Sequence, residues 1–435
     1  HGLKKILDLM KRINLIIILI FTVLSLQLDA QTGINSPYSR YGLGQLYLEN
    51  LNTVSVAMGG LGIALHDPTI LNPANPASYG TLDSSAFLFE VGVSGNATTL
   101  KTNTLTESGY DATLSYIFIG FPITRWWRSG AGIMPFSKIG YNVQVLVPVD
   151  NFSDVVHSFS GDGGLNRVFW GNGFNISENL RVGIDASYLF GQSSRLSMIF
   201  YPDSSNIFGT KVENHISVGD FIFDYGIQYD LKLGEKTKLT IGATYAQKFN
   251  LSANYNYLSK TIIGGYNGLL EQVVDTIEYR PDEEGSIVLP ARLGFGLALT
   301  NEGNWMIGAD FEWQKWKEFE AFGVEDSLSN SWRVTLGGAF TPKHTNISSI
   351  FKRMTYRAGL RYNQSYLKFY NNPITEFGIS FGVSFPLKNS KTGIDLGVDF
   401  GRRGTTDNNL IQENFFDISL GVSIQENWFQ KRKYR

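Results

Sequence analysis

The chain has no cysteine and little charge, and almost no stretch after its first thirty residues has a helical pattern. Without cysteine it cannot contain a disulfide framework, a thiolate metal site or a lipid anchor attached through sulfur. Charged residues make up 17% of the 435 residues, against roughly 25% in an ordinary soluble domain. The formal net charge of -2 gives no basic surface for nucleic acid, so nucleic acid is not an expected partner.

No motif for catalysis or cofactor binding stands out. The five histidines, at positions 1, 66, 157, 215 and 344, lack the spacing of metal ligands. The sequence "GGLG" at 59–62 lacks the third glycine, the preceding strand and the following helix of a dinucleotide-binding fingerprint. With no Gly-x-Ser-x-Gly elbow, Walker loop or paired catalytic carboxylates, we predict a non-enzyme with no cofactor, no metal and no catalytic residue.

The first thirty residues form a separate segment. Four basic residues precede an apolar run at 13–26. That run is too short for a comfortable membrane helix of about twenty residues. Residues 1–30 therefore predict a secretory signal peptide cleaved after Ala30, with an exported mature chain that begins near Gln31. The alternative is an uncleaved membrane anchor.

From residue 85 onward the dominant pattern has a period of two. In "FIFDYGIQYD", Phe221 and Phe223 lie on one face, while Ile222 and Asp224 lie on the other. Regular alternation of this kind indicates half-exposed strands. We count fourteen such segments, near 85–100, 109–123, 128–147, 164–176, 180–200, 212–230, 237–258, 285–300, 304–317, 330–341, 353–366, 375–386, 391–403 and 412–429.

The number, length and connections of these strands favour a membrane barrel. Closed bacterial outer-membrane barrels have an even number of long, tilted strands, with short turns at one end and longer loops at the other. Here 177–179 and 300–304 are predicted turns, whereas 201–211 and 259–284 are predicted outer loops. The second loop contains the acidic "PDEEG" at 281–285. A soluble propeller or tandem sandwiches would also alternate and are the alternative.

The charged residues of these strands share one face. A lipid-facing Arg at mid-membrane costs about 2–4 kcal/mol, and Asp or Glu somewhat less, so the charges must face the lumen. Seven of the eight tryptophans, Trp316 among them, lie near predicted strand ends, where interfacial aromatic girdles form. The predicted lumen-facing polar residues are Asp185, Asp224, Asp310, Glu312, Arg357, Arg361, Asp395 and Asp399.

Several stretches resemble a known family. The sequence "GGLGIALHDPTILNPANPASYG" at 59–80 resembles the N-terminal segment of the FadL-like long-chain fatty-acid transporter family of outer-membrane proteins. The stretches "GLNRVFWGNGFNISENLRVGIDASYLFGQ", "LPARLGFGLAL" and "MIGADFEWQKW" are similar to its later strands. "SPYSRYGLGQL" and "WFQKRKYR" resemble its Bacteroidota branch. One departure is "NPANPA", which has a second proline where the family commonly has glycine.

The resemblance implies an N-terminal hatch that plugs the lumen. We expect the hatch to include Arg40, Gly59, Gly60, Gly62, His66, Asp67, Pro68, Asn72, Pro73 and Pro76. His66, Asp67 and Arg40 either form a polar latch to lumen charges such as Asp310 or Arg361, or Asp67-Pro68 simply starts a turn. We favour the turn.

Pro135 lies inside the third predicted strand. Proline cannot donate a ladder hydrogen bond, so it indicates a break, a bulge or an edge at this point. In the family that this sequence resembles, a kink in the third strand opens a lateral exit, and Pro135 is the candidate for that kink. The alternative is a bulge that only eases barrel curvature.

The sequence thus predicts an all-β fold, a 14-stranded antiparallel transmembrane β-barrel with an N-terminal hatch, in the outer membrane. The predicted organisation is signal peptide 1–30, hatch 31–84, barrel 85–429 and basic C-terminal tail 430–435. The first functional hypothesis is passive uptake of a hydrophobic, fatty-acid-like ligand with lateral exit. The second is a non-conducting accessory or scaffold subunit of an outer-membrane assembly or secretion machine. Outer-membrane lipid is an expected partner of either, and protein partners belong to the second.

Overall fold

The computed structural model describes residues 36–46, 51–148, 155–201, 207–264, 271–342, 349–387 and 392–427. The predicted signal peptide, 1–30, and the predicted basic tail, 430–435, lie outside these residues. Within the described ranges, no helix has both the length and the apolar character needed to cross a membrane.

Strands make up most of the described chain, and the few helices are short. The strands are β1 Gln45–Leu46, β2 Ala86–Lys101, β3 Thr106–Pro122, β4 Trp127–Val147, β5 Val155–Asn175, β6 Leu180–Phe200, β7 Gly209–Lys232, β8 Thr237–Ala246, β9 Phe249–Ile263, β10 Gln272–Leu289, β11 Arg292–Asn301, β12 Trp305–Gln314, β13 Glu320–Ala321, β14 Val324–Glu325, β15 Ser331–Phe340, β16 Thr355–Phe369, β17 Asn372–Pro386, β18 Gly393–Arg403 and β19 Gln412–Asn427. The helices are η1 Pro37–Arg40, α2 Thr53–Val56, η2 Pro76–Thr81, η3 Trp316–Glu318, α3 Ile350–Arg353 and η4 Asp407–Asn409.

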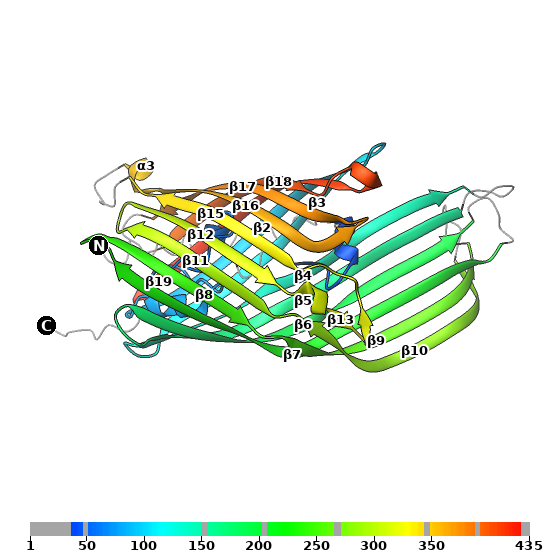
Figure 1. Cartoon of the computed structure of the whole chain (residues 1–435), viewed down its shortest axis with the longest axis horizontal. Coiled ribbons are helices and arrows are strands. Elements are labelled where there is room, and N and C mark those ends of the chain that lie inside the picture. Colours follow the sequence, from blue (N-terminus) through cyan, green and yellow to red (C-terminus); the bar gives the residue numbers. More distant parts are fainter. Residues whose placement is uncertain are drawn as a thin grey trace, which may run out of the picture. The chain divides into compact units, whose positions relative to one another are not determined.

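The strands close into a 14-stranded antiparallel barrel (Figure 1). β8 and β9 together count as one strand of the barrel wall, and β10 and β11 together count as the next. The second of these strands is interrupted at Pro290. β19 pairs with β2 from Gln412–Lys101 to Asn427–Ala86, which joins the last strand to the first. This pairing leaves no open edge between the first and the last strand of the wall. The all-β, 14-stranded antiparallel barrel predicted from the sequence is confirmed.

The wall is continuous at the end where β2 begins and β19 ends, which we call the turn end. At the opposite end, the loop end, the wall divides. β3 pairs with β4 only from Pro122–Arg128 to Ile117–Ile133, although β4 continues to Val147 in register with β5. Strands β4, β5, β6, β7, β9 and β10 continue together as an extension sheet (Figure 1).

The predicted outer loops at 201–211 and 259–284 are therefore wrong in part. β7 begins at Gly209, β9 continues to Ile263, and β10 begins at Gln272. The acidic 281–285 stretch lies within β10 instead of a loop. Both faces of β10 are exposed over most of its length, so the strand has no apolar-polar alternation to reveal it.

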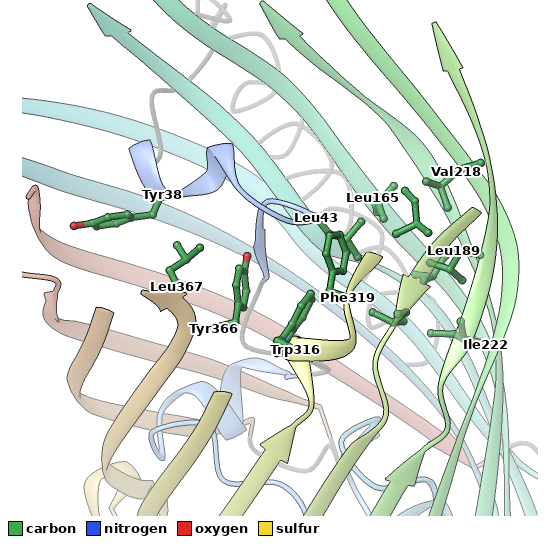
Figure 2. Packing of buried hydrophobic residues seen from close by; sticks show 14 of the residues in the cluster. Tyr38, Leu43, Leu165, Leu189, Val218, Ile222, Trp316, Phe319, Tyr366 and Leu367 are labelled. Carbon is green, nitrogen blue, oxygen red and sulfur yellow. The ribbon is translucent and has the colours of Figure 1, made fainter. Parts of the chain in front are cut away.

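A hydrophobic cluster lies in the loop half of the lumen (Figure 2). Trp316, which the sequence predicted at an interfacial girdle, is only 1% exposed and stacks on Tyr366 with ring centroids 4.4 Å apart. It lies inside because the connection between β12 and β15 folds back into the barrel, with β13 paired to β10. We call this group the loop-end cluster; its members include Tyr38, Leu43, Leu165, Leu189, Val218, Ile222, Trp316, Phe319, Tyr366 and Leu367.

Candidate functional site

The candidate site is the interior of the barrel, where the N-terminal segment, described at 36–46 and 51–85, packs against the inner wall. The turn at 57–60, which directly follows α2, packs on wall positions that carry no side chain. A Cβ added to Gly359 would lie 2.0 Å from the Met58 carbonyl carbon, and one added to Gly337 would lie 2.5 Å from the Met58 carbonyl oxygen. Glycine on the inner face of β15 and β16 is thus required by the close approach of the N-terminal segment.

The glycines predicted for the hatch have two different roles. Gly59 and Gly60 adopt φ values of +73° and +97°, a left-handed region that favours glycine. Gly62 has an ordinary conformation, but a Cβ there would lie 2.5 Å from the Cβ of Ala74. The tight path of this segment depends on all three residues.

The side chains of the "NPANPA" stretch form hydrogen bonds to other parts of the N-terminal segment. The Asn72 amide donates to the carbonyls of Gly62 and Leu65, at 2.7 and 2.9 Å. Asn75 donates to the carbonyl of Ile63 at 2.7 Å and caps η2, in which Pro76 takes the first position. Pro73 lies in the turn between these two asparagines. Asparagine and proline together therefore set a defined path.

Buried carboxyl groups on the barrel wall accept hydrogen bonds from the N-terminal segment. Asp310 accepts from the backbone N–H groups of Gly62 and Ile63, at 2.7 and 2.9 Å. Glu90 accepts from the N–H of Leu71 at 2.8 Å, and Asp185 accepts from the Tyr79 hydroxyl at 3.1 Å. Breaking a hydrogen bond to a buried acceptor is costly, so the segment is anchored at three points around the wall.

His66 contacts wall residues that the sequence did not single out. Its Nε2 lies 3.1 Å from Thr240 Oγ1 and 3.4 Å from Asp230 Oδ1. Arg181 donates to both oxygens of Asp230, at 2.8 and 2.9 Å. Burial lowers the pKa of His66 from its ordinary value, although the hydrogen bond to Asp230 acts in the opposite direction.

The latch to Asp310 or Arg361 does not form. Asp67 accepts from the N–H and hydroxyl of Thr69, at 2.8 and 2.6 Å, which is the turn that the sequence favoured. Pro68 is exposed, and its carbonyl accepts from the N–H of Asp83 at 3.2 Å. Arg40 lies over the ring of Phe159, 3.8 Å from its centroid.

Several of the predicted lumen-facing residues are members of buried ion-pair networks. Arg167, which the sequence reading missed, donates to Asp224 at 2.8 Å and lies 3.6 Å from Asp185. Arg292 donates to the second oxygen of Asp224 at 3.0 Å. Arg167 shares its face with Phe169, opposite the exposed Val168 and Trp170, so the period of two could have revealed it.

A second network lies across β16, β17, β18 and β19. Arg361 donates to Glu376 at 2.8 Å and to Asp399 at 2.7 Å. Arg403 joins Glu376 to Glu413, at 2.8 and 3.0 Å. Of these five residues, the sequence reading identified only two.

The remaining predicted residues form two smaller groups. Glu312 accepts from Arg333 on the neighbouring strand. Arg357 donates to the Ser384 hydroxyl, which donates to Asp395. All four charged groups of these pairs are mostly buried, with side-chain exposures of 9–19%.

A cavity of about 290 Å³ separates the loop-end cluster from the lower part of the N-terminal segment. Its lining includes Leu51 and Val56 from below and Tyr38 and Tyr366 from above. Charged groups of the second network, such as Arg361, Arg403 and Glu413, also line it. The cavity extends to Met134, Pro135 and Lys138 on β4.

Pro135 lies at the point where the wall divides. The β3–β4 ladder ends at Ile117–Ile133, and the β4–β5 register shifts between Pro135 and Ser137. We call the gap between β3 and β4 beyond this point the seam. Lys138 forms an ion pair with Asp111 across it. On the inner side of the seam, β1 pairs with Ser137 and Lys138.

The BamG family model matches residues 10–435. No curated protein matches the chain in sequence. The *Ralstonia pickettii* toluene transporter TbuX is similar in structure, with a TM-score of 0.59 at 15% identity, over 87% of this chain and 98% of that one. The *Pseudomonas putida* toluene transporter TodX gives 0.56 at 15% identity, over 88% of this chain and all (100%) of that one. The monoaromatic hydrocarbon channel CymD gives 0.53 at 13% identity, over 88% and 100%.

Identities this low concern the fold alone. The fold of these three structures agrees with the resemblance to FadL-like barrels. The Bacteroidota branch and the specificity for long-chain fatty acids stay predictions.

Proposed function

The chain belongs to the BamG family, and from this premise we propose that it is a non-conducting accessory subunit of an outer-membrane protein assembly. The observation that carries the proposal is a lumen filled at two levels by the chain's own residues. The lower level is the N-terminal segment from residue 51 onward, and the upper level is the loop-end cluster, which includes Tyr38 and Leu43.

The way the lower level is held favours a permanent seal. Asp310, Glu90 and Asp185 bond the segment from three sides of the wall. Removing a partner from such a buried bond costs about 1–3 kcal/mol, so displacing the whole segment would cost several times that amount. A passive transporter has no energy source for this displacement.

The charged lining of the cavity also disfavours passage of an apolar compound. Arg361, Arg403 and Glu413 face the space between the two levels. A hydrophobic molecule there would displace water from charged groups without pairing with them, which is costly. Buried ion-pair networks that link neighbouring strands are well suited instead to fixing a rigid barrel.

We also propose that the barrel lies in the outer membrane. Strand residues such as Phe221, Trp170 and Ile307 project from the barrel as large exposed apolar side chains. An apolar band of this kind fits contact with lipid, while the lumen holds the charges. Export through a signal peptide at 1–30 is the matching expectation.

Isolation of the tagged barrel from native membranes in mild detergent tests the proposal. Mass spectrometry of the proteins and the lipids should identify a stoichiometric outer-membrane protein partner and no enriched hydrophobic cargo. A monomeric barrel that carries a specific hydrophobic compound would contradict the proposal.

One observation favours a second function, the passage of hydrophobic compounds. The cavity reaches Pro135, where the β3–β4 ladder has already ended, so a lateral path toward lipid is short. Its volume of about 290 Å³ lies at the small end for ligand pockets, which span roughly 300–1,000 Å³. Within this second proposal, a small aromatic compound fits better than a long-chain fatty acid, and the exit is the seam.

A further inference from the structure

At the seam, β4 has an unpaired edge that plays no part in the proposed seal of the lumen. Beyond Ser137, β4 pairs with β5 without a register shift up to Val147. On its other edge, β1 pairs with Ser137 and Lys138, while the Gly140 N–H donates to Ser39 and its carbonyl accepts from the Ser36 N–H. In the described part of the chain, no backbone group pairs with this edge from Tyr141 to Val147.

The two backbone hydrogen bonds of Gly140 show in which direction the unpaired N–H and C=O groups of β4 point. Both of its backbone groups point away from β5, toward the N-terminal segment. Backbone groups in an antiparallel strand alternate in direction with every residue. The N–H and C=O groups of Asn142, Gln144 and Leu146 therefore point into the seam.

This edge lacks the features that usually protect an exposed edge. Natural proteins place charges, proline or bulges on free edges to prevent pairing with other chains. Residues 139–147, "IGYNVQVLV", contain no charge and no proline, and Val145 and Leu146 are 45% and 65% exposed. The free edge of β10 differs, because it carries Pro281 and three register shifts, and residues 271–286 include six carboxylates.

The opposite side of the seam is a second free edge. Among the described residues, no strand pairs with β3 on that side from Thr106 to Tyr116, while β3 stays paired with β2 on the other. The ion pair between Lys138 and Asp111 spans the seam, so the two edges lie within the combined reach of two side chains. Beyond this ion pair, the β4 edge offers a single row of backbone groups, which one added strand can pair with.

We propose that the seam binds one extended segment of a partner protein, which pairs antiparallel with β4 from Tyr141 to Val147. This strand addition continues the ladder that β1 begins on the same edge. The partner segment should be uncharged, with apolar residues at alternate positions, because the edge offers Val143 and Val145 on one face and Asn142 and Gln144 on the other. The inference rests on the proposed function as a subunit of an assembly.

Proline at position 144 tests the proposal without disturbing the barrel. The N–H of Gln144 points into the seam, so Gln144→Pro removes a hydrogen bond to the partner while the β4–β5 ladder keeps its bonds. Gln144→Thr changes the side chain but keeps the N–H and is the matched control. A photo-crosslinking residue at Val145, introduced in the full chain in native membranes, reports on the occupant.

The expected adduct joins position 145 to one short segment of a single partner protein. Gln144→Pro should reduce its yield at least tenfold, while Gln144→Thr retains it. In the isolated complex, the amides of Asn142 and Leu146 should exchange hydrogen at least tenfold more slowly than in the barrel alone. Adducts to a second copy, to residues that precede Ser36 or to lipid would overturn the proposal, as would an adduct that Gln144→Pro leaves unchanged.

The two proposals fail in different ways. A stoichiometric complex whose adducts and protected amides lie elsewhere overturns the strand addition alone. A barrel that forms no complex in native membranes overturns the proposed function as well.

Discussion

Gly359 shows at the scale of one residue how the wall and the N-terminal segment fit together. An added Cβ would overlap the backbone of Met58 and Gly59, at 2.0 and 2.3 Å, so Gly359→Ala must displace the turn that follows α2. Overpacking of this kind costs about 1–3 kcal/mol. We expect faster hydrogen exchange at 53–60, measured by mass spectrometry, with little change in the barrel strands.

Gly95→Ala is the matched control for this substitution. The nearest atom to an added Cβ there, the carbonyl oxygen of Asp111, is 3.9 Å away, which is ordinary van der Waals contact. Equal exchange rates in the two variants would contradict the close packing of the 57–60 turn on β16.

Asp310 is the wall carboxylate with the most direct hold on the segment. Asp310→Ala leaves the N–H groups of Gly62 and Ile63 without their acceptor, at about 1–3 kcal/mol for each buried group. We expect segment 57–66 to become sensitive to a nonspecific protease at concentrations that leave the wild type intact. Asp310→Asn keeps an acceptor oxygen and should lie between the two, whereas wild-type resistance of Asp310→Ala would exclude this anchoring role.

At the scale of one element, Trp316 holds the inward-folded connection between β12 and β15. Its indole donates to Gln314 at 3.0 Å and stacks on Tyr366. Trp316→Ala should cost about 3–5 kcal/mol locally. The exposed Lys315 and Lys317 beside it should then be cleaved by trypsin at least tenfold faster.

Trp170→Ala provides the comparison for that experiment. Trp170 is 59% exposed on the outer wall, so its removal should leave cleavage at Lys315 and Lys317 unchanged. Equal acceleration in both variants would indicate general destabilisation instead of release of the connection.

The strands themselves could be predicted because alternation follows from having lipid on one side and the filled lumen on the other. β6 was predicted at its observed bounds, 180–200. β9 and β10 extend beyond their predicted bounds, and in β10, at the edge of the extension sheet away from the seam, both faces are exposed over most of the strand, so the pattern is lost. Strand pairing there depends on backbone hydrogen bonds, which leave no period in the sequence.

The charged residues of the lumen could be predicted by face but not by partner. Asp224 and Asp399 were assigned to the inner face from alternation alone. Their partners Arg167 and Arg361 come from strands distant in sequence, and barrel register decides which carboxylate each guanidinium reaches. For the same reason, the contact of His66 with Asp230 could not be predicted from either residue's neighbours.

At the scale of the whole barrel, the proposed seal depends on the wall, the N-terminal segment and the loop-end cluster, and the seam is a separate feature. If the lumen is sealed as we propose, the barrel itself passes nothing, and the uncharged β4 edge is the place where we propose that another protein binds. The packing inside the lumen is the reason for proposing a subunit role ahead of a channel role.

Flux through the purified barrel tests the seal most directly. The wild-type chain is inserted into liposomes, and the entry of toluene and of a labelled fatty acid is followed against protein-free liposomes. A sealed lumen predicts entry at the protein-free rate for both compounds, in the wild type and in Gly95→Ala alike. Saturable, protein-dependent entry of either compound would contradict the account and favour passage through the seam.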